Sequence, residues 1–188
     1  MTKVRALKTR KQINDVGDLL NKHYGRHFLQ MWRFAVNVGL RMGDVLSISM
    51  EQAKKGLKDG HIEIKEQKKK KYNRFDLNIV AKQIIEERVK ENKTDLWLFQ
   101  SHGNNAKAME KPISRNAVYL ALREVGQIYG VKLGTHSARK SRARLMYESG
   151  ETLESIASVL NHDDIKDTIK YIDITQDEKD RTYHEYVI

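Results

Sequence analysis

One segment interrupts a chain whose other apolar residues recur at helical spacing. In residues 59–77, Ile62 and Ile64 alternate with polar residues, Phe75 and Leu77 do the same, and four consecutive lysines lie between the two alternating parts. Alternation places successive side chains on opposite faces of a strand. The sequence therefore predicts one antiparallel hairpin with a basic tip in a mainly α fold, which is an α+β class with a small antiparallel β-sheet.

Candidate capping residues divide the remainder of the chain into helices. Thr9 with Gln12 three residues later resembles a capping box, so the first helix is expected to run to about Tyr24. A second, largely buried helix is followed by a break at residues 39–44, and a short helix is expected to begin near Asp44. Later helices are expected to start at Asn78, Ser114, Ser137, Thr152, Asp163-Asp164 and Thr175.

Composition indicates where the protein is located and what kind of partner it binds. The 188-residue chain has no cysteine, which excludes disulfides, thiolate metal sites and a cysteine nucleophile and agrees with an intracellular protein. No run approaches the roughly 18 apolar residues of a membrane span, so a soluble cytoplasmic protein with no membrane partner is expected. A net charge of +10 predicts a polyanionic partner, although charge alone also suits a ribosomal or membrane-surface protein.

Four side chains in the last third of the chain suggest a site for a phosphodiester. His136 and Arg139 lie three residues apart at a predicted helix start, where both side chains and the helix N-terminus favour an anion. His162 and Tyr171 would lie on opposite faces of an unbroken helix, but the break at Asp163-Asp164 lets them converge. Taken singly, the same residues also fit a basic surface helix, a helix cap and a half-buried aromatic side chain.

The whole order of these residues resembles the tyrosine recombinase (phage integrase) family. The matching positions, between about Thr9 and the tail, are Gly39-Leu40-Arg41 with Asp44, Lys68 in the hairpin, His136-x-x-Arg139, Asn161-His162 and Tyr171. The sequence departs from the family pattern at Ala138, where leucine is commoner, at Lys140, where histidine is frequent, and at Asn161, where many members have glycine. The resemblance implies the catalytic-domain fold of that family.

The resemblance also implies a set of catalytic residues, which are Arg41, Lys68, His136, Arg139, His162 and the nucleophile Tyr171. A phenol with a pKa of about 10 is a poor nucleophile at neutral pH, so such a site must stabilise charge on the phosphate. We expect the two arginines and His162 to do so. Lys68 is expected to protonate the departing 5′-oxygen, and His136 to orient the phosphate or assist proton movement at Tyr171. Asp44 is expected to hold the architecture, and no metal or other cofactor is implied.

The organisation and the partners follow from the same resemblance. Residues 1–8 are expected to form a basic N-terminal arm, 9–174 the catalytic domain, and 175–188 a tail helix that packs on its own domain or on a neighbouring protomer. The arm is expected either to lie on the DNA backbone or to be a solvated, disordered terminus. The expected partners are double-stranded DNA, further copies of the chain in a tetramer on DNA that dissociates to monomers without it, and accessory DNA-bending or directionality factors.

The expected DNA contacts are Lys69, Lys70, Lys71, Arg115, Arg123, Lys140 and Arg142. Each of the three hairpin lysines is also an alternative to Lys68 as the catalytic lysine. The expected location is the nucleoid of a bacterial or phage-infected cell.

Three functions remain open at this point. The first is site-specific DNA recombination through a 3′-phosphotyrosyl intermediate, as integration, excision or inversion. The second is DNA relaxation like that of a type IB topoisomerase, which shares the tyrosine chemistry but needs no partner site. The third is DNA binding by a catalytically idle domain of the same fold.

Overall fold

Ten helices and one hairpin make up the part of the chain that the computed structural model describes, which is residues 4–68, 70–103, 110–185 and 187. The helices are α1 Arg10–Tyr24, α2 Arg26–Val38, α3 Met42–Leu46, α4 Met50–Asp59, α5 Ile79–Glu91, α7 Arg115–Tyr129, α8 Ser137–Glu148, α9 Leu153–Val159, α10 Ile165–Ile172 and α11 Gln176–Glu185. The strands β1 His61–Lys65 and β2 Tyr72–Asp76 pair antiparallel, with Ile64 opposite Asn73. The predicted mainly α fold with one small antiparallel sheet is confirmed.

The local signals placed most helix starts correctly. Thr9 and Gln12 form a reciprocal capping box at the start of α1, and the Asn78 side chain accepts a hydrogen bond from Ala81 N–H at the start of α5. Ser114, Thr152 and Asp164 cap α7, α9 and α10, and Thr175 accepts from Glu178 N–H before α11. Helix α4 was not predicted, although Ser49-x-x-Gln52 forms a capping box at its start.

The predicted cap at Ser137 is wrong. His136 occupies the N-cap position of α8, and Ser137 is the first helical residue. The Ser137 hydroxyl has two partners outside the helix: it accepts from Gly134 N–H and donates to the Arg5 carbonyl. Its oxygen thus accepts from the turn before the helix, and its O–H donates to a segment 132 residues away in the sequence.

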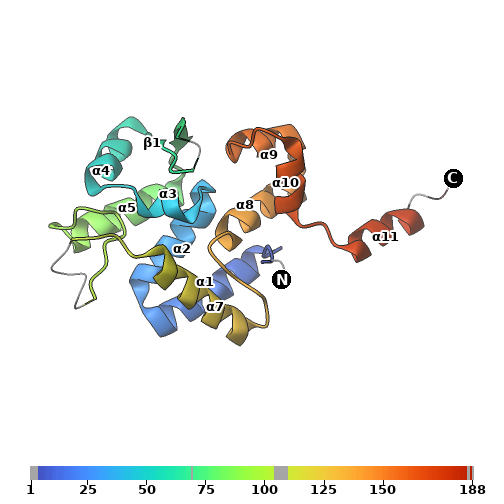
Figure 1. The fold of residues 1–188 in the computed structure, drawn as a ribbon, viewed down its shortest axis with the longest axis horizontal. Helices are drawn as coiled ribbons and strands as arrows, with labels where there is room; N and C mark the ends of the chain where they lie inside the picture. Colours follow the sequence, from blue (N-terminus) through green and yellow to red (C-terminus); the bar gives the residue numbers. More distant parts are fainter. Residues whose placement is uncertain (1–3, 69, 104–109, 186, 188) are drawn as a thin grey trace.

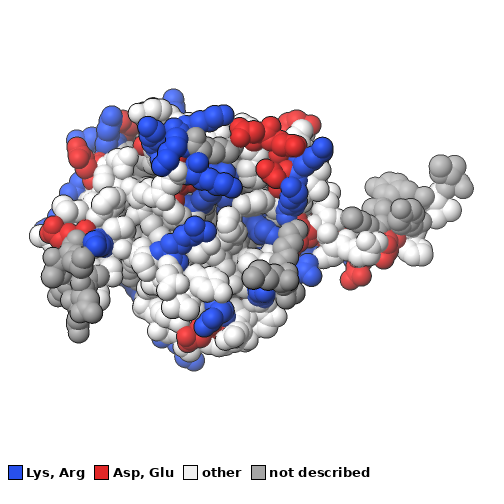
Figure 2. Space-filling view, in the orientation of Figure 1, with Lys and Arg blue, Asp and Glu red and all other residues white. Residues whose placement is uncertain are grey.

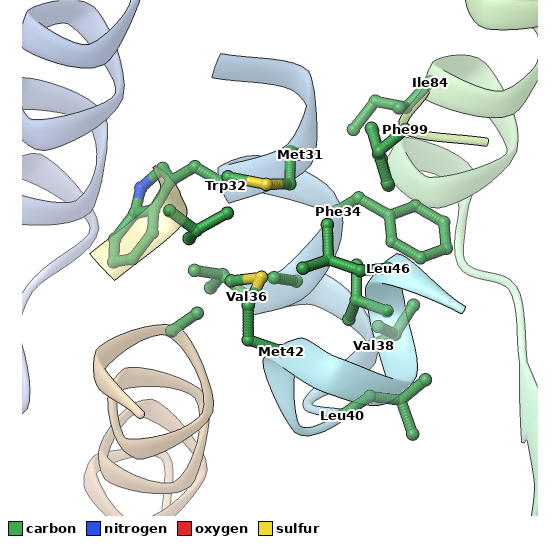
Figure 3. Packing of buried hydrophobic residues seen from close by; sticks show 14 of the residues in the cluster. Met31, Trp32, Phe34, Val36, Val38, Leu40, Met42, Leu46, Ile84 and Phe99 are labelled. Carbon is green, nitrogen blue, oxygen red and sulfur yellow. The ribbon is translucent and has the colours of Figure 1, made fainter. Parts of the chain in front are cut away.

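Helix α2 is the centre of the hydrophobic core, and it packs against α1, α5 and α8. Figure 3 shows its side chains pointing in several directions, with Trp32 toward α1 and Phe34 toward Phe99 and Ile84. The Trp32 ring is fully buried and its indole N–H donates to the Ile13 carbonyl oxygen, so burial of the large apolar ring leaves no polar atom unpaired. The Phe34 and Phe99 rings meet edge to face at 5.6 Å between centroids.

A second, smaller apolar cluster joins α8, α9 and α10 through Ala143, Ile156, Leu160 and Ile172. This cluster holds the C-terminal helices against the α8 face. In Figure 1 the green hairpin and the orange α9 and α10 stand on either side, with α3 and α8 between them. Helix α11 extends away from the rest of the molecule. Within the described residues, no helix is long and apolar enough to span a membrane.

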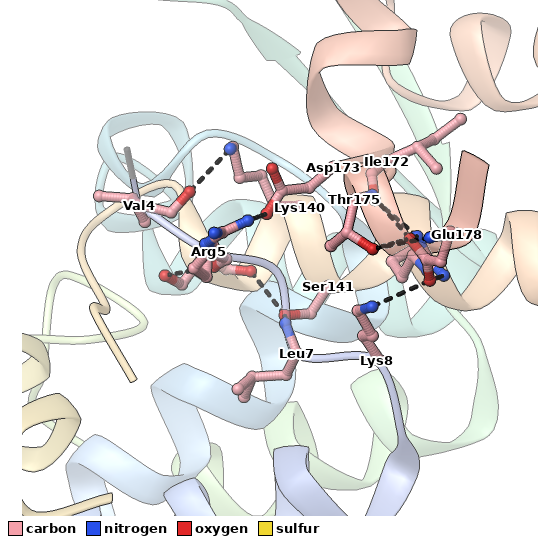
Figure 4. Close-up of polar contacts among 12 residues, drawn as sticks. Val4, Arg5, Leu7, Lys8, Lys140, Ser141, Ile172, Asp173, Thr175 and Glu178 are labelled. Atoms are coloured by element: carbon pink, nitrogen blue, oxygen red, sulfur yellow. Dashed lines mark hydrogen bonds and ion pairs between the residues drawn. The ribbon is translucent and has the colours of Figure 1, made fainter. Parts of the chain in front are cut away.

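The N-terminal segment is packed on the domain in residues 4–8, so the expectation of a solvated terminus is wrong there. Arg5 N–H donates to the Lys132 carbonyl, and Leu7 N–H donates to the Ser141 hydroxyl. The Leu7 side chain is 1% exposed. Figure 4 shows this segment lying along α8, where the Lys140 ammonium donates to the Val4 carbonyl.

The beginning of the tail is fixed beside the same segment by one carboxylate. Glu178 accepts hydrogen bonds from the Lys8 ammonium, the Thr175 backbone N–H and the Arg144 guanidinium (Figure 4). Partial burial favours a higher pKa for Glu178, but these donors outweigh burial and hold its pKa well below the ordinary value of 4.5. The anchor therefore depends on an ionised carboxylate.

We predict that Glu178→Gln lowers the free energy of unfolding by about 1 to 2 kcal/mol at pH 7. Because the folded-state pKa lies below the unfolded-state pKa, this contribution is present above pH 4.5 and is lost as the pH falls toward the folded-state pKa. Urea denaturation at a series of pH values measures it. The difference between the wild type and the variant should narrow below pH 4.5. Asp180→Asn, on the same helix, removes an acceptor of exposed Gln176 and should stay within about 0.5 kcal/mol throughout. An equal loss in both variants would contradict the prediction.

Candidate active site

A cavity of about 600 Å³ opens between the hairpin, α3 and the N-terminal ends of α7, α8 and α10. Five of the six predicted catalytic residues line it, namely Arg41, Lys68, His136, His162 and Tyr171. Other residues in its wall are Asp44, Gln67, Arg115, Thr135, Asp163 and Asp167. The structure thus brings together residues that are as far apart in the sequence as Arg41 and Tyr171.

Tyr171 reaches the cavity because the chain changes direction between α9 and α10. Asn161 takes the left-handed conformation, with φ of 49°, and Asp164 caps the new helix. After this turn the Tyr171 hydroxyl lies 2.9 Å from His136 Nδ1, and its ring stands at 68° to the His162 ring with 4.9 Å between centroids. The predicted convergence of His162 and Tyr171 is therefore confirmed.

The two histidines of the site have different surroundings. Burial, together with Arg115, Arg139, Lys140 and Arg41, lowers the pKa of His136 from the ordinary value of 6.5, so its imidazole is neutral at pH 7. A neutral ring has one bare nitrogen that accepts a proton, and Nδ1 faces the tyrosine hydroxyl. His162 Nδ1 lies 2.9 Å from the hydroxyl of the fully buried Thr168, a contact that the sequence analysis missed.

Arg139 lies beneath the cavity and does not line it. Its side chain is 1% exposed, and its guanidinium donates to the carbonyl oxygens of Gly39 and Leu160. Burial and the nearby Arg41 lower its pKa to about 10, so it remains charged at neutral pH. The guanidinium carbon is 5.7 Å from the centre of the Tyr171 ring. Its charge is therefore next to the tyrosine, while two of its donors hold the backbone on both sides of the cavity.

Two carboxylates connect Arg41 and α3 to the hairpin. The Arg41 guanidinium donates to Glu66 Oε2 at 2.7 Å, and Asp44 Oδ1 accepts from Gln67 N–H at 2.8 Å. The second contact supports the structural role predicted for Asp44. Glu66 is fully buried and was not predicted as a site residue. The alternating pattern of β1 could have predicted its burial, because Glu66 continues the inward-facing series of Ile62 and Ile64 at alternate positions.

Among the described lysines of the hairpin tip, Lys68 lines the cavity and is exposed. The Lys71 ammonium lies 3.6 Å from an Asp163 carboxylate oxygen on the opposite wall. Lys70 is in the left-handed conformation and closes the tip through a hydrogen bond to the Glu66 carbonyl. Lys69 lies outside the described residues.

The other predicted DNA contacts divide into two groups. Arg115 lines the cavity, and Arg123 lies further along α7 with its guanidinium 5.9 Å from the Tyr119 ring centre. Lys140 and Arg142 form the second group and do not line the cavity. Lys140 is 6% exposed because its ammonium turns inward to the Val4 carbonyl, and Arg142 packs its side chain against Gly39 beside a separate cavity. Figure 2 shows Lys and Arg side chains gathered over the hairpin and α3, whereas acidic side chains gather over the top of α9 and α10.

Several solved structures share this fold at low sequence identity. XerA recombinase matches with a TM-score of 0.74 and 12% identity, over 98% of this chain and 65% of that chain. XerH site-specific recombinase, bound to its palindromic difH substrate after cleavage, matches with a TM-score of 0.73 and 16% identity, over 97% of this chain and 53% of that chain. A lambda integrase dimer bound to a COC′ core site matches with a TM-score of 0.67 and 17% identity, over 92% of this chain and 61% of that chain. The present chain thus spans between about half and two thirds of these proteins.

Sequence comparison shows the family of the chain as well as its fold. The probable integrase/recombinase YoeC of Bacillus subtilis (strain 168) is 31% identical over 176 residues, which cover 93% of this chain and 92% of YoeC. Residues 8–178 match the sequence model of the phage integrase family. This match and the identity to YoeC show that the chain belongs to the phage integrase family, the tyrosine recombinases.

Proposed function

We propose that the chain is a site-specific DNA recombinase that cuts and rejoins DNA through a 3′-phosphotyrosyl intermediate. The observation that carries this proposal is the hydrogen bond between the Tyr171 hydroxyl and His136 Nδ1, in a cavity that Arg41, Lys68 and His162 also line. A nucleophile, a proton acceptor and cationic groups for a phosphate thus face one space. This supports catalysis over DNA binding by an idle domain.

In the proposed first step, the Tyr171 oxygen attacks a DNA phosphorus atom and its proton passes to His136. The imidazole is available to accept this proton because its lowered pKa leaves it unprotonated at neutral pH. The buried Arg139 charge, 5.7 Å from the tyrosine ring, stabilises the phenolate as it forms. A new Tyr171 O–P bond forms as the bond from phosphorus to the 5′-oxygen breaks.

The departing 5′-oxygen takes a proton from Lys68, which reaches the cavity from the hairpin tip. Arg41 and His162 donate to the non-bridging oxygens of the five-coordinate phosphorus, where negative charge accumulates. Rejoining reverses each step with the 5′-hydroxyl of a second strand, so the phosphotyrosyl bond conserves the energy of the phosphodiester.

The proposed substrate is double-stranded DNA, and the basic surface over the hairpin and α3 supports this (Figure 2). The cavity lining favours Arg115 as a phosphate contact. Lys70 and Lys71 at the hairpin tip are proposed as further phosphate contacts, and so is Arg123 further along α7. The DNA-bound state is proposed to be a tetramer assembled from monomers, with α11 exchanged between protomers and accessory DNA-bending or directionality factors in the nucleoid. Residues 9–174 form the proposed catalytic domain.

We predict that Tyr171→Phe abolishes covalent trapping. Cleavage sites are first mapped by recovering protein-linked fragments of host genomic DNA, and a nicked suicide substrate carrying one such site is then incubated with each protein. The wild type should give an adduct that survives denaturation in SDS, and the variant should give none because it lacks the phenol oxygen. Absence of any wild-type adduct would contradict the proposed function. Relaxation of a site-free plasmid by the monomer would instead favour topoisomerase activity.

The cleavage rate should have an acidic limb set by His136. Because the pKa of His136 lies below 6.5, the neutral imidazole persists at pH 6.5, and single-turnover cleavage should fall only at lower pH as the ring becomes protonated. His136→Gln should slow cleavage by about 10² to 10⁴ and remove this limb. A limb that is unchanged in His136→Gln would show that another group titrates.

Lys68→Ala should slow cleavage by about 10² to 10⁴ on ordinary DNA and far less on DNA with sulfur in place of the scissile 5′-oxygen. A thiolate leaves without being protonated, because its pKa of about 8.5 makes it a better leaving group than an alkoxide. Lys65→Ala, which removes an exposed lysine from the same hairpin, should stay within about threefold on both substrates. Equal defects of Lys68→Ala on the two substrates would rule out the general-acid role.

A further inference from the structure

Glu66 is the point at which three parts of the cavity wall meet. It follows β1, two residues before Lys68, and its side chain is fully buried. Oε2 accepts from the Arg41 guanidinium at 2.7 Å, while Oε1 accepts from the Asn161 amide at 3.0 Å and from the Asn73 amide at 3.0 Å. One carboxylate therefore links the hairpin, the turn before α3 and the turn that precedes His162.

The contact with Arg41 is one of two hydrogen bonds that join the hairpin to α3 and the turn before it. Glu66 on the hairpin receives the Arg41 guanidinium, and Asp44 on α3 receives the Gln67 backbone N–H. Lys68 is the next residue after Gln67, so these two contacts hold the backbone that leads to Lys68 relative to Arg41 and α3. The tip itself is closed by Glu66 N–H donating to the Lys71 carbonyl and by Lys70 N–H donating to the Glu66 carbonyl.

The contact with Asn161 crosses the cavity and is specific to an asparagine. With φ of 49°, position 161 suits glycine or asparagine, but only asparagine supplies an amide that reaches Glu66. His162 is the next residue, and its ring stands against Tyr171. Asn161 thus joins the turn that carries His162 to the carboxylate that also holds Arg41.

We propose that Glu66 is a positioning residue, which fixes Arg41, the Lys68 hairpin and the His162 turn relative to one another before DNA binds. The inference rests on the proposed function of the same cavity. A buried carboxylate costs free energy unless its oxygens are paired, and here the paired donors come from each part that must be aligned. Glu66 does not touch DNA in this arrangement, so it acts on the chemical step through Arg41 and Asn161.

The first test is single-turnover cleavage of the suicide substrate at saturating protein. Glu66→Gln has nearly the same shape, but its amide group replaces an oxygen that accepts from Arg41 or Asn161. We expect it to slow cleavage by about 10- to 100-fold, the range for a lost hydrogen bond to a charged group. DNA affinity should change by less than about threefold, because no phosphate contact is removed. Wild-type cleavage by Glu66→Gln would overturn the proposal.

Asn161→Gly tests the contact across the cavity without backbone strain, since glycine accepts the left-handed conformation. It should slow cleavage by about three- to tenfold. If Asn161 acts through Glu66, the double variant should be no slower than Glu66→Gln alone, whereas independent effects would multiply. Multiplying effects would contradict the proposal.

Asn73→Ala is the matched control, because Asn73 bonds to the same Glu66 oxygen from within the hairpin. It should remain within about threefold of the wild-type cleavage rate. A loss as large as that of Asn161→Gly would mean that Glu66 only stabilises the hairpin, and this would overturn the positioning role.

Amide hydrogen exchange of the DNA-free protein separates this proposal from the proposed function, because it needs no cleavage. Glu66→Gln should speed exchange both in the hairpin, residues 61–76, and in the turn at residues 161–164. Faster exchange in the hairpin alone would contradict the link across the cavity, even if the wild type were found to cleave no DNA. If Glu66→Gln speeds exchange in both places but the wild type gives no adduct, the proposed function fails and the positioning of the side chains stands.

Discussion

The buried guanidinium of Arg139 is the interaction on which the arrangement of the cavity depends. A charge at 1% exposure is costly unless its donors are used, and two of them bind the carbonyl oxygens of Gly39 and Leu160. Gly39 precedes the turn that carries Arg41, and Leu160 precedes the turn that carries His162. Arg139 therefore connects the large apolar core to the smaller cluster of α8, α9 and α10, and each catalytic turn begins at one of its two contacts.

The polar groups of the site contact one another directly. Tyr171 contacts His136 and Arg41 contacts Glu66, so the nucleophile and a cationic group for the phosphate are each held by a neighbouring side chain. Preorganised groups of this kind stabilise a transition state without having to move during the reaction. The polar connections among them run through backbone carbonyls and buried carboxylates, which hold the elements more firmly than exposed ion pairs do.

The sequence predicted features that depend on neighbouring residues and missed those that depend on distant ones. The capping boxes at Thr9 and Thr175 and the alternating hairpin are local patterns, and all three are present. The convergence of Arg41 with Tyr171 came from the family resemblance, since spacing alone does not bring together residues so far apart. Glu66 and Asn161 are 95 residues apart, and the bond between them depends on packing that no local pattern encodes. The same reason applies to Lys140, which was predicted to contact DNA but is covered by the N-terminal segment: helical spacing gives the face on which a residue lies but not the distant segment that packs on that face.

The packed N-terminal segment has a practical consequence for protein engineering. Leu7 fills a buried position, and the Val4 carbonyl holds the Lys140 ammonium, which lies 6.0 Å from the Tyr171 ring centre. An affinity tag or fluorescent protein joined directly to Val4 would therefore begin close to the nucleophile. Truncation to the first residue of α1 would empty the core position of Leu7 and remove the Val4 carbonyl that accepts from Lys140 beside the tyrosine. Helix α11 extends away from the body, so a label joined after it would not begin beside the nucleophile (Figure 1).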